Sequence, residues 1–192
     1  MLSLELSTTL LWMPAVLIGE ICSYLLMPNP SPIVYHVPIN QRRMITHAAQ
    51  LDTSVREAKW KRIATTTSQC YFHAMARMGE CFFATGGPLV EMPPMCLQRY
   101  NPSTSMWTKL KGIHTKRDSY AVAATPDHLF VMGGIVGLSA VAIVEMYRAP
   151  TCMWYSLPMM NMARSDMAAT THLGCIYVMG GFVGGKRVSS CE

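Results

Sequence analysis

The segments LFVMGGIVG (Leu129–Gly137) and IYVMGGFVG (Ile176–Gly184) resemble each other closely and lie 47 residues apart. Another step of 47 residues toward the N-terminus reaches FFATGGPLV (Phe82–Val90). The same period relates the aromatic and basic residues Trp60, Trp107 and Trp154, Tyr100 and Tyr147, and Arg117 and Arg164. Several residue types that recur at one period indicate an internal repeat, which has to be recognised before any local motif is interpreted.

A local match to a phosphate-binding loop lies inside this repeat. Gly180–Lys186 fits the pattern G-x-x-x-x-G-K, but Arg187 stands where a phosphate-binding loop has Ser or Thr, and no helical pattern follows. The glycine pair also recurs at Gly86–Gly87 and at Gly133–Gly134. We therefore interpret the match as part of the repeat and not as a nucleotide site.

One copy of the repeat contains four short runs that we predict to be strands. These runs are Ser119–Ala124, Leu129–Met132, Ala142–Tyr147 and Met153–Pro158. The turn formers of Thr125–Asp127 separate the first two runs, and Gly133–Gly134 end the second. A period near 50 residues with a glycine pair is typical of the four-stranded blades of a β-propeller.

The pattern R…(L/I)(F/Y)VMGG…V-E-x-Y…W over residues 60–192 resembles the kelch repeat, of the BTB-kelch or kelch-like type. This resemblance implies an all-β fold, an incomplete kelch-type β-propeller of about three and a half four-stranded blades. The residues that would hold the blades are Trp60, Gly86, Gly87, Tyr100, Trp107, Gly133, Gly134, Tyr147, Trp154, Gly180 and Gly181.

The resemblance also implies a function, that of a non-enzymatic protein-protein interaction module. In many kelch proteins the propeller follows BTB and BACK domains and presents substrates to cullin-type ubiquitin ligases. An actin or cytoskeletal scaffold is the alternative, and a fragment of a copper enzyme similar to galactose oxidase is a second one.

The chain divides into three parts by composition. Residues 1–33 form an atypical apolar N-terminal segment with a linker, residues 34–70 a degenerate first blade, and residues 71–192 the kelch repeats, the last of them truncated. Within the first part, Thr8–Met27 is apolar but contains Pro14 and Glu20, and no Lys or Arg precedes it. Since a signal peptide begins with positive charge, we expect a buried helix or degenerate strand, with a membrane or secretory role as the alternative.

Glu192 occupies the place of Glu145 in the repeat, so the sequence stops within the third strand of a blade. Propellers close with roughly four to eight blades, and proteins normally avoid an unpaired strand edge. We expect that the sequence is a fragment of a longer protein. A half-propeller that associates with a second copy of itself is the alternative.

The chain has 16 basic and 11 acidic residues. The basic residues are scattered along the chain, except in the run KLKGIHTKR (Lys109–Arg117). Nucleic-acid binding requires a concentrated basic patch, so we expect no nucleic-acid partner. In kelch propellers the connection from a fourth strand to the next first strand, together with the loop after the glycine pair, commonly forms the partner-binding face. The resemblance thus implies that this run lies on that face.

We expect a protein partner to contact eight residues of this face. They are His114, Lys116, Arg117, Asp118 and Ser119 in one copy, and Arg164, Ser165 and Asp166 in the next. A contiguous basic and polar rim suits acidic or phosphorylated partners. For Arg117 and Arg164 the alternative is a structural role, because a residue repeated in every blade often serves the blade itself.

Catalytic and metal signatures are weak. The histidines His36, His47, His73, His114, His128 and His172 show no metal-ligand spacing. A triad of His114, Asp118 and Ser119 is suggested only by closeness in sequence, whereas triads are recognised by geometry. We expect no catalytic residue, no bound metal and no cofactor.

The seven cysteines form no C-x-x-C pair, and none recurs at the 47-residue period. Glycosylation acceptors are also missing, because Asn29 and Asn101 are both followed by proline. These observations favour free, buried thiols in a reducing compartment, and hence a cytoplasmic protein.

Overall fold

The residues that follow the repeat pattern form short strands joined by tight turns. A computed structural model of the chain describes residues 47–52, 59–65, 70–88 and 95–192. Its strands are β1 (His47–Asp52), β2 (Lys59–Thr65), β3 (Cys70–Met78), β4 (Cys81–Pro88), β5 (Cys96–Asn101), β6 (Met106–Leu110), β7 (Ala121–Ala124), β8 (His128–Met132), β9 (Ile135–Val136), β10 (Ser139–Ala140), β11 (Val144–Arg148), β12 (Met153–Leu157), β13 (Ala168–His172), β14 (Cys175–Met179), β15 (Phe182–Val183) and β16 (Lys186–Arg187).

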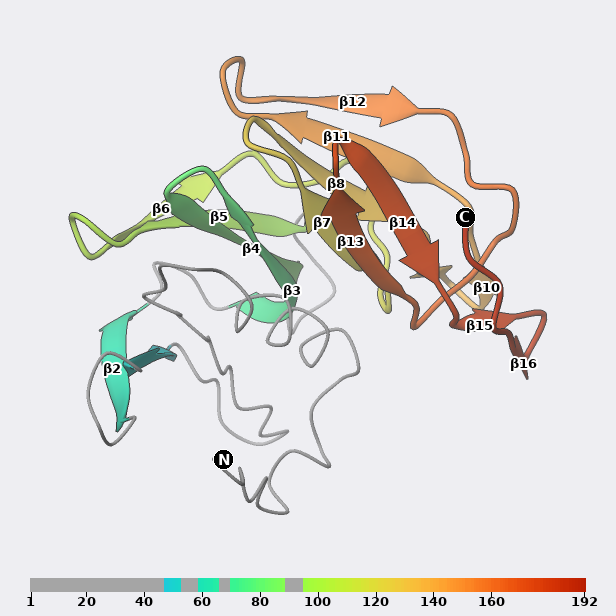
Figure 1. Cartoon of the computed structure of the whole chain (residues 1–192), viewed down its shortest axis with the longest axis horizontal. Helices are drawn as coiled ribbons and strands as arrows, with labels where there is room; N and C mark the ends of the chain where they lie inside the picture. The colour runs from blue at the N-terminus through green and yellow to red at the C-terminus, as the bar shows by residue number, and fades with distance from the viewer. Residues whose placement is uncertain (1–46, 53–58, 66–69, 89–94) are drawn as a thin grey trace.

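Successive repeats form successive antiparallel sheets, whose strands lie in chain order (Figure 1). The first sheet has the order β3-β4-β5-β6, and the second sheet has the order β7-β8-β11-β12, with the hairpin β9–β10 inserted after β8. In the third sheet β13 pairs with β14, and Cys191 forms a bridge to Met179 in β14. The predicted all-β fold with four-stranded blades is therefore confirmed.

Each predicted strand of the second sheet overlaps an observed one, and the ends differ by at most two residues. The first strand of the second sheet begins at Ala121 and not at Ser119, because Ser119 has a φ of 52°, in the left-handed region that strands do not adopt. The third strand begins at Val144 and not at Ala142. Leu129, at the start of the predicted second strand, is fully buried.

The segment that matches a phosphate-binding loop forms a hairpin. Phe182–Val183 pairs with Lys186–Arg187, and the two residues of the turn, Gly184 and Gly185, have φ values of 55° and 77°. Two residues with positive φ are the requirement of the tight turns that join antiparallel strands. No helix opens after Lys186, so the chain here lacks the geometry in which helix N-termini hold phosphates.

Two clusters of buried side chains hold the three sheets together. One cluster joins the first and second sheets and contains Ala76, Met78, Phe83, Met95, Leu97, Ile113, Tyr120, Val122, Leu129, Val131, Tyr147 and Trp154. The other joins the second and third sheets and contains Ala121, Ala123, Phe130, Met132, Val144, Met167, Ala169 and Val178. Because side chains alternate along a strand, β7 and β8 contribute one face to each cluster.

The repeated tyrosine and tryptophan of each copy lie opposite each other on paired strands. The Tyr147 and Trp154 rings are 5.4 Å apart, and the Tyr100 and Trp107 rings are 5.1 Å apart. Trp154 Nε1 donates a hydrogen bond of 2.8 Å to the carbonyl of Lys111, on the connection that follows the first sheet. At Trp154 a large apolar ring with one polar tip thus joins the first and second sheets.

Two of the three glycine pairs allow a close backbone approach. Gly134 has a φ of 100°, and a Cβ there would lie 2.4 Å from the carbonyl oxygen of Asp118. Gly181 has a φ of 90°, and a Cβ there would lie 2.4 Å from the carbonyl oxygen of Ser165. The pair at Gly86 differs, because β4 continues through it to Pro88.

The N-terminal part of the chain is described only in β1 and β2, which pair as an antiparallel hairpin. None of the residues that the structure describes belongs to a helix long and apolar enough to cross a membrane. The predictions for residues 1–33 lie outside the described residues. The division of the chain at residues 33 and 70 stays a prediction.

The cysteines differ from the expectation of free, buried thiols. Cys96 is disulfide-bonded. Cys81, Cys152, Cys175 and Cys191 are free, but Cys81 is only partly buried and the other three are exposed. The predicted free thiol is therefore wrong for Cys96. The predicted burial is wrong for the other four cysteines, because three of them lie in turns or at the margin of a sheet.

Candidate partner-binding site

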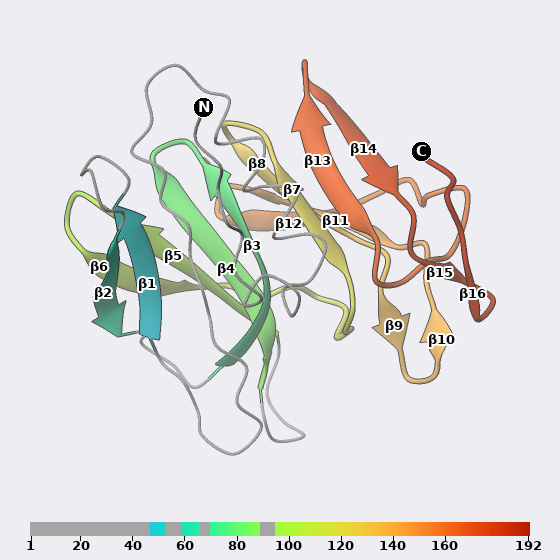
Figure 2. The ribbon, with the colours of Figure 1, turned by 60° about the horizontal axis from the view of Figure 1, so that its bottom comes forward.

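Two equivalent connections lead into the first strands of the second and third sheets. They are residues 111–120, between β6 and β7, and residues 158–167, between β12 and β13. Each is tied to the hairpin of its own repeat by two backbone hydrogen bonds. Asp118 and Ile135 exchange bonds of 3.0 and 2.7 Å, and Ser165 and Phe182 exchange bonds of 3.1 and 2.8 Å. Figure 2 shows the hairpins β9–β10 and β15–β16 at the same end of the molecule. We call this end, with both connections, the loop face.

A buried arginine fixes each connection to the third strand of its own repeat. Arg117 Nη2 lies 2.9 Å from Glu145 Oε2, and Arg117 Nη1 donates a 2.8 Å hydrogen bond to the carbonyl of Ile143. Both side chains of this ion pair are at most 2% exposed. Burial lowers the pKa of Arg117 and Glu145 opposes that effect, and an arginine stays charged throughout.

The next repeat has the same pair at the positions 47 residues later. Arg164 Nη2 lies 2.7 Å from Glu192 Oε1, and Arg164 Nη1 donates a 3.1 Å hydrogen bond to the carbonyl of Ser190. Glu192 is the more accessible of the two glutamates, with 15% of its side chain exposed. Repetition of the ion pair and of the hydrogen bond to the carbonyl two residues before the glutamate shows that the arginine and the glutamate are structural parts of the repeat.

Of the eight residues predicted to contact a partner, three are buried. Arg117, Arg164 and Ser165 are 1%, 0% and 4% exposed. This burial leaves the two arginine side chains almost no surface for a partner to contact, and for them the structural interpretation holds. Burial follows from the ion pairs, since a desolvated guanidinium needs a carboxylate beside it.

The other five predicted residues reach the surface. His114, Lys116, Asp118 and Asp166 are exposed and Ser119 is half-buried. His114 Nδ1 lies 3.7 Å from Glu145 Oε1, so the described partner of this histidine is the third-strand carboxylate. Among the residues that the structure describes, no group of three or more His, Cys, Asp and Glu side chains is arranged to hold a metal ion.

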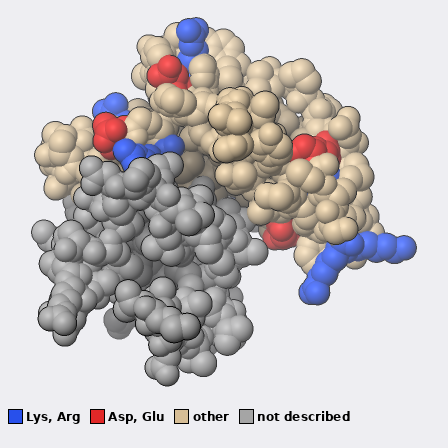
Figure 3. All heavy atoms as spheres, viewed as in Figure 1, with Lys and Arg blue, Asp and Glu red and all other residues tan. Residues whose placement is uncertain are grey.

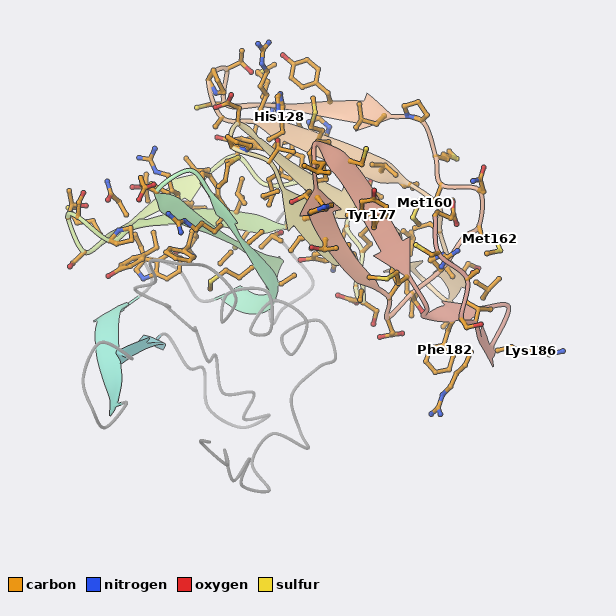
Figure 4. The ribbon with its side chains drawn as sticks, viewed as in Figure 1. His128, Met160, Met162, Tyr177, Phe182 and Lys186 are labelled. Atoms are coloured by element: carbon orange, nitrogen blue, oxygen red, sulfur yellow. The ribbon has the colours of Figure 1, made fainter. Side chains whose placement is uncertain are left out.

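A groove with a volume of about 760 Å³ lies between the two hairpins of the loop face. Its walls and floor come from both repeats: Ile135, Leu138, Ser139, Ala140, Met162, Ala163, Ser165, Asp166, Phe182, Val183, Gly184 and Gly185. Figure 4 shows Phe182 and Lys186 projecting from the β15–β16 hairpin, with His128 at the opposite end of the second sheet. Two of the predicted residues, Ser165 and Asp166, thus belong to a groove whose other lining residues were not predicted.

Residues 163–192 match the family model described as the Kelch motif. The third repeat is therefore similar to a Kelch motif. The match includes one buried Arg–Glu pair, one glycine pair and the hairpin β15–β16. No curated protein matches the chain.

The kelch match supports assignment of the chain to a kelch-repeat family, since the second repeat has the same contacts 47 residues earlier. The antiparallel sheets described above, two of them four-stranded, are consistent with blades of a kelch-type β-propeller. Kelch repeats generally form interaction domains and not enzymes, which agrees with the predicted class.

Acid is expected to weaken the third kelch repeat through Glu192. Burial would raise the pKa of this carboxyl, but hydrogen bonds from the Asn161 and Met162 amides and from Arg164 outweigh burial and hold its pKa below the ordinary value of a glutamate. A carboxyl whose pKa is lower in the folded than in the unfolded protein stabilises the fold when the pH is above its unfolded pKa. That stabilisation is lost as the pH falls below about 4.3, the ordinary pKa of a glutamate. Glu192→Gln should therefore flatten the decline of the urea midpoint between pH 6 and pH 3.

Glu80→Gln is the control for this measurement, because Glu80 is a carboxylate that is 92% accessible and whose ion pair with Arg77 lies at the surface, unlike the buried pairs of the repeat. It should keep the acid dependence of the unmodified chain. A decline in Glu192→Gln as steep as that of the control would show that the Glu192 contacts do not carry the pH effect.

Proposed function

We propose that the chain is a protein-protein interaction module whose partner binds at the loop face. The observation that carries this proposal is the groove, which two consecutive repeats build together from their equivalent connections and hairpins. A groove of this size takes a few side chains of a partner, as ligand sites of roughly 300–1,000 Å³ do.

Within this function, the role that we propose is substrate recognition for a cullin-type ubiquitin ligase in the cytoplasm, as in proteins of BTB-kelch type. Support comes from the Kelch motif and from the exposed position of the loop face. Partners with acidic or phosphorylated segments suit the exposed cations Lys116, Lys186 and Arg187 at this face. Co-sedimentation with actin filaments would instead assign the module to the cytoskeleton.

Charge reversal on the loop face should weaken a partner without destabilising the protein. The double variant Lys116→Glu/Asp118→Lys changes two exposed side chains next to buried Arg117. We expect capture of at least one partner to fall about tenfold, because complementary charge governs association. The melting temperature should change by no more than about 2 °C, as is usual for surface substitutions in a chain of this size.

The measurement is quantitative mass spectrometry of proteins captured from cells by the tagged full chain. A matched control, Asp127→Lys/Arg148→Glu, makes the same charge changes at exposed positions at the other end of the second sheet. Equal loss of a partner in both variants, or a parallel fall of capture and melting temperature, would show that the loop face is not the binding surface.

A further inference from the structure

Two short hairpins form the walls of the groove and leave it open to solvent. At Gly137 in the first hairpin and at Gly184 and Gly185 in the second, an added Cβ would meet nothing within 4 Å. The turns therefore stand free of the rest of the described chain. An occupant can enter from outside as an extended or looped segment, without any movement of the sheets.

The groove is mainly apolar. Leu138 at the tip of the first hairpin is 104% exposed and Phe182 on the second hairpin is 37% exposed, and the half-buried Met162 lies between the repeats. A leucine fully exposed beside an aromatic ring and a methionine forms an apolar surface of the kind that marks binding sites. A single large apolar side chain of a partner, placed between the hairpins, would cover these groups.

Two cations directly follow Gly184 and Gly185, the turn that lines the groove. Lys186 and Arg187 on β16 are exposed, and neither has a carboxylate partner within 4 Å in the described part of the chain. The Arg187 guanidinium lies 5.7 Å from the centre of the Phe182 ring, which also lines the groove. In Figure 3 blue side chains project at the end of the molecule where Figure 1 places β15 and β16.

One acidic side chain also lines the groove, but it is already engaged. Asp166 Oδ2 accepts a hydrogen bond of 2.9 Å from Ser165 Oγ, next to the connection that leads into β13. Two cations against one carboxylate leave a positive balance at the groove. The cations lie on the hairpin β15–β16, while Asp166 lies at the start of the third sheet, so the two ends of the groove differ in sign.

We propose that the groove binds a short linear segment of a partner protein in which one large apolar residue is followed or preceded by acidic residues. The apolar side chain lies between Leu138 and Phe182, over Met162, and the carboxylates lie against Lys186 and Arg187. This inference rests on the proposed function and specifies the chemistry of the partner at the same face.

Selection of a random heptapeptide phage library on the full chain tests the proposal. We expect the enriched peptides to combine Leu, Ile, Met or Phe with at least two Asp or Glu residues. Synthetic versions of these peptides should bind about tenfold more weakly to Lys186→Glu/Arg187→Glu, and about tenfold more weakly to Leu138→Ser. Raising the salt concentration should weaken binding to the unmodified chain.

The chain supplies matched controls for both changes. Lys109→Glu/Arg148→Glu reverses two exposed cations outside the groove, and Leu173→Ser changes a leucine that is 88% exposed in the turn between β13 and β14. These four variants alter exposed side chains, so each should retain the melting temperature of the unmodified chain.

The outcomes separate this inference from the proposed function. Peptides that bind and are lost with Leu138→Ser but carry no acidic residues would overturn the charge assignment and leave the interaction module standing. Peptides whose affinity is unchanged by every groove variant would place the binding site elsewhere. If no peptide is enriched, the groove does not hold a linear segment and the inference is wrong, whereas the capture experiment with Lys116→Glu/Asp118→Lys decides the proposed function.

Discussion

Replacement of Gly134 by alanine is expected to lower the free energy of unfolding by about 3 kcal/mol or more. Gly134 has a φ of 100°, which strains any residue with a Cβ, and such strain costs on the order of 1–3 kcal/mol. The new Cβ would also lie 2.4 Å from the Asp118 carbonyl oxygen, a backbone atom held by the pairing of Asp118 with Ile135. Relief of that overlap requires movement of the connection into β7.

Gly137→Ala is the matched control for this prediction. Gly137 has a positive φ of 62°, but a Cβ there would meet nothing within 4 Å, so the loss should be only about 1 kcal/mol. Urea denaturation of the two variants measures both values. Equal destabilisation of the two variants would show that the positive φ alone requires glycine at Gly134, and that the short distance to the Asp118 carbonyl oxygen does not.

Replacement of Glu145 by glutamine should cost about 3 kcal/mol of stability. The substitution keeps the shape of the side chain but leaves the Arg117 guanidinium charged in a position that is 1% exposed. Its remaining described hydrogen bonds, to the carbonyls of Ile143 and Val131, do not neutralise the charge. Removal of one partner of a buried pair is costly because the other remains desolvated and uncompensated.

The double variant Arg117→Met/Glu145→Leu tests this explanation, because it removes both charges and fills the same space with apolar groups. Its stability should return to within about 1–2 kcal/mol of the unmodified chain. The urea midpoints of the single and double variants give the comparison. A double variant less stable than Glu145→Gln would show that hydrogen bonds to the backbone, and not charge, make this pair important.

The fold could be predicted because each copy of the repeat gives separate evidence for the same strands and turns. The strands of the second sheet, the turn near Asp127 and the positions of Tyr147 and Trp154 all follow from comparison of copies. Strand ends were less predictable. Ser119 has a φ of 52°, and for this reason β7 begins only at Ala121. Asp166, 47 residues later, has the same φ, but neither Ser nor Asp at these positions predicts it.

The site was predicted only in part, for physical reasons. Periodicity shows that Arg117 recurs but not whether it faces solvent, and its burial depends on Glu145, which is distant in sequence. The glutamates also recur at the 47-residue period, so this signal was present in the sequence. The groove could not be found in this way, because Leu138 and Lys186 lie in hairpins whose sequences differ between repeats.

The division of β7 and β8 between two buried clusters has a consequence for cooperativity. Val122 and Val131 belong to one cluster, and Ala123 and Phe130, their neighbours along the strands, belong to the other. Each sheet therefore depends on the sheets beside it for burial of its apolar faces, so the three sheets behave as coupled units. The central unit transmits that coupling, and a loss of order in β7 and β8 would expose the buried faces of both outer sheets and leave the β13–β14 hairpin without the packing that a two-stranded sheet needs.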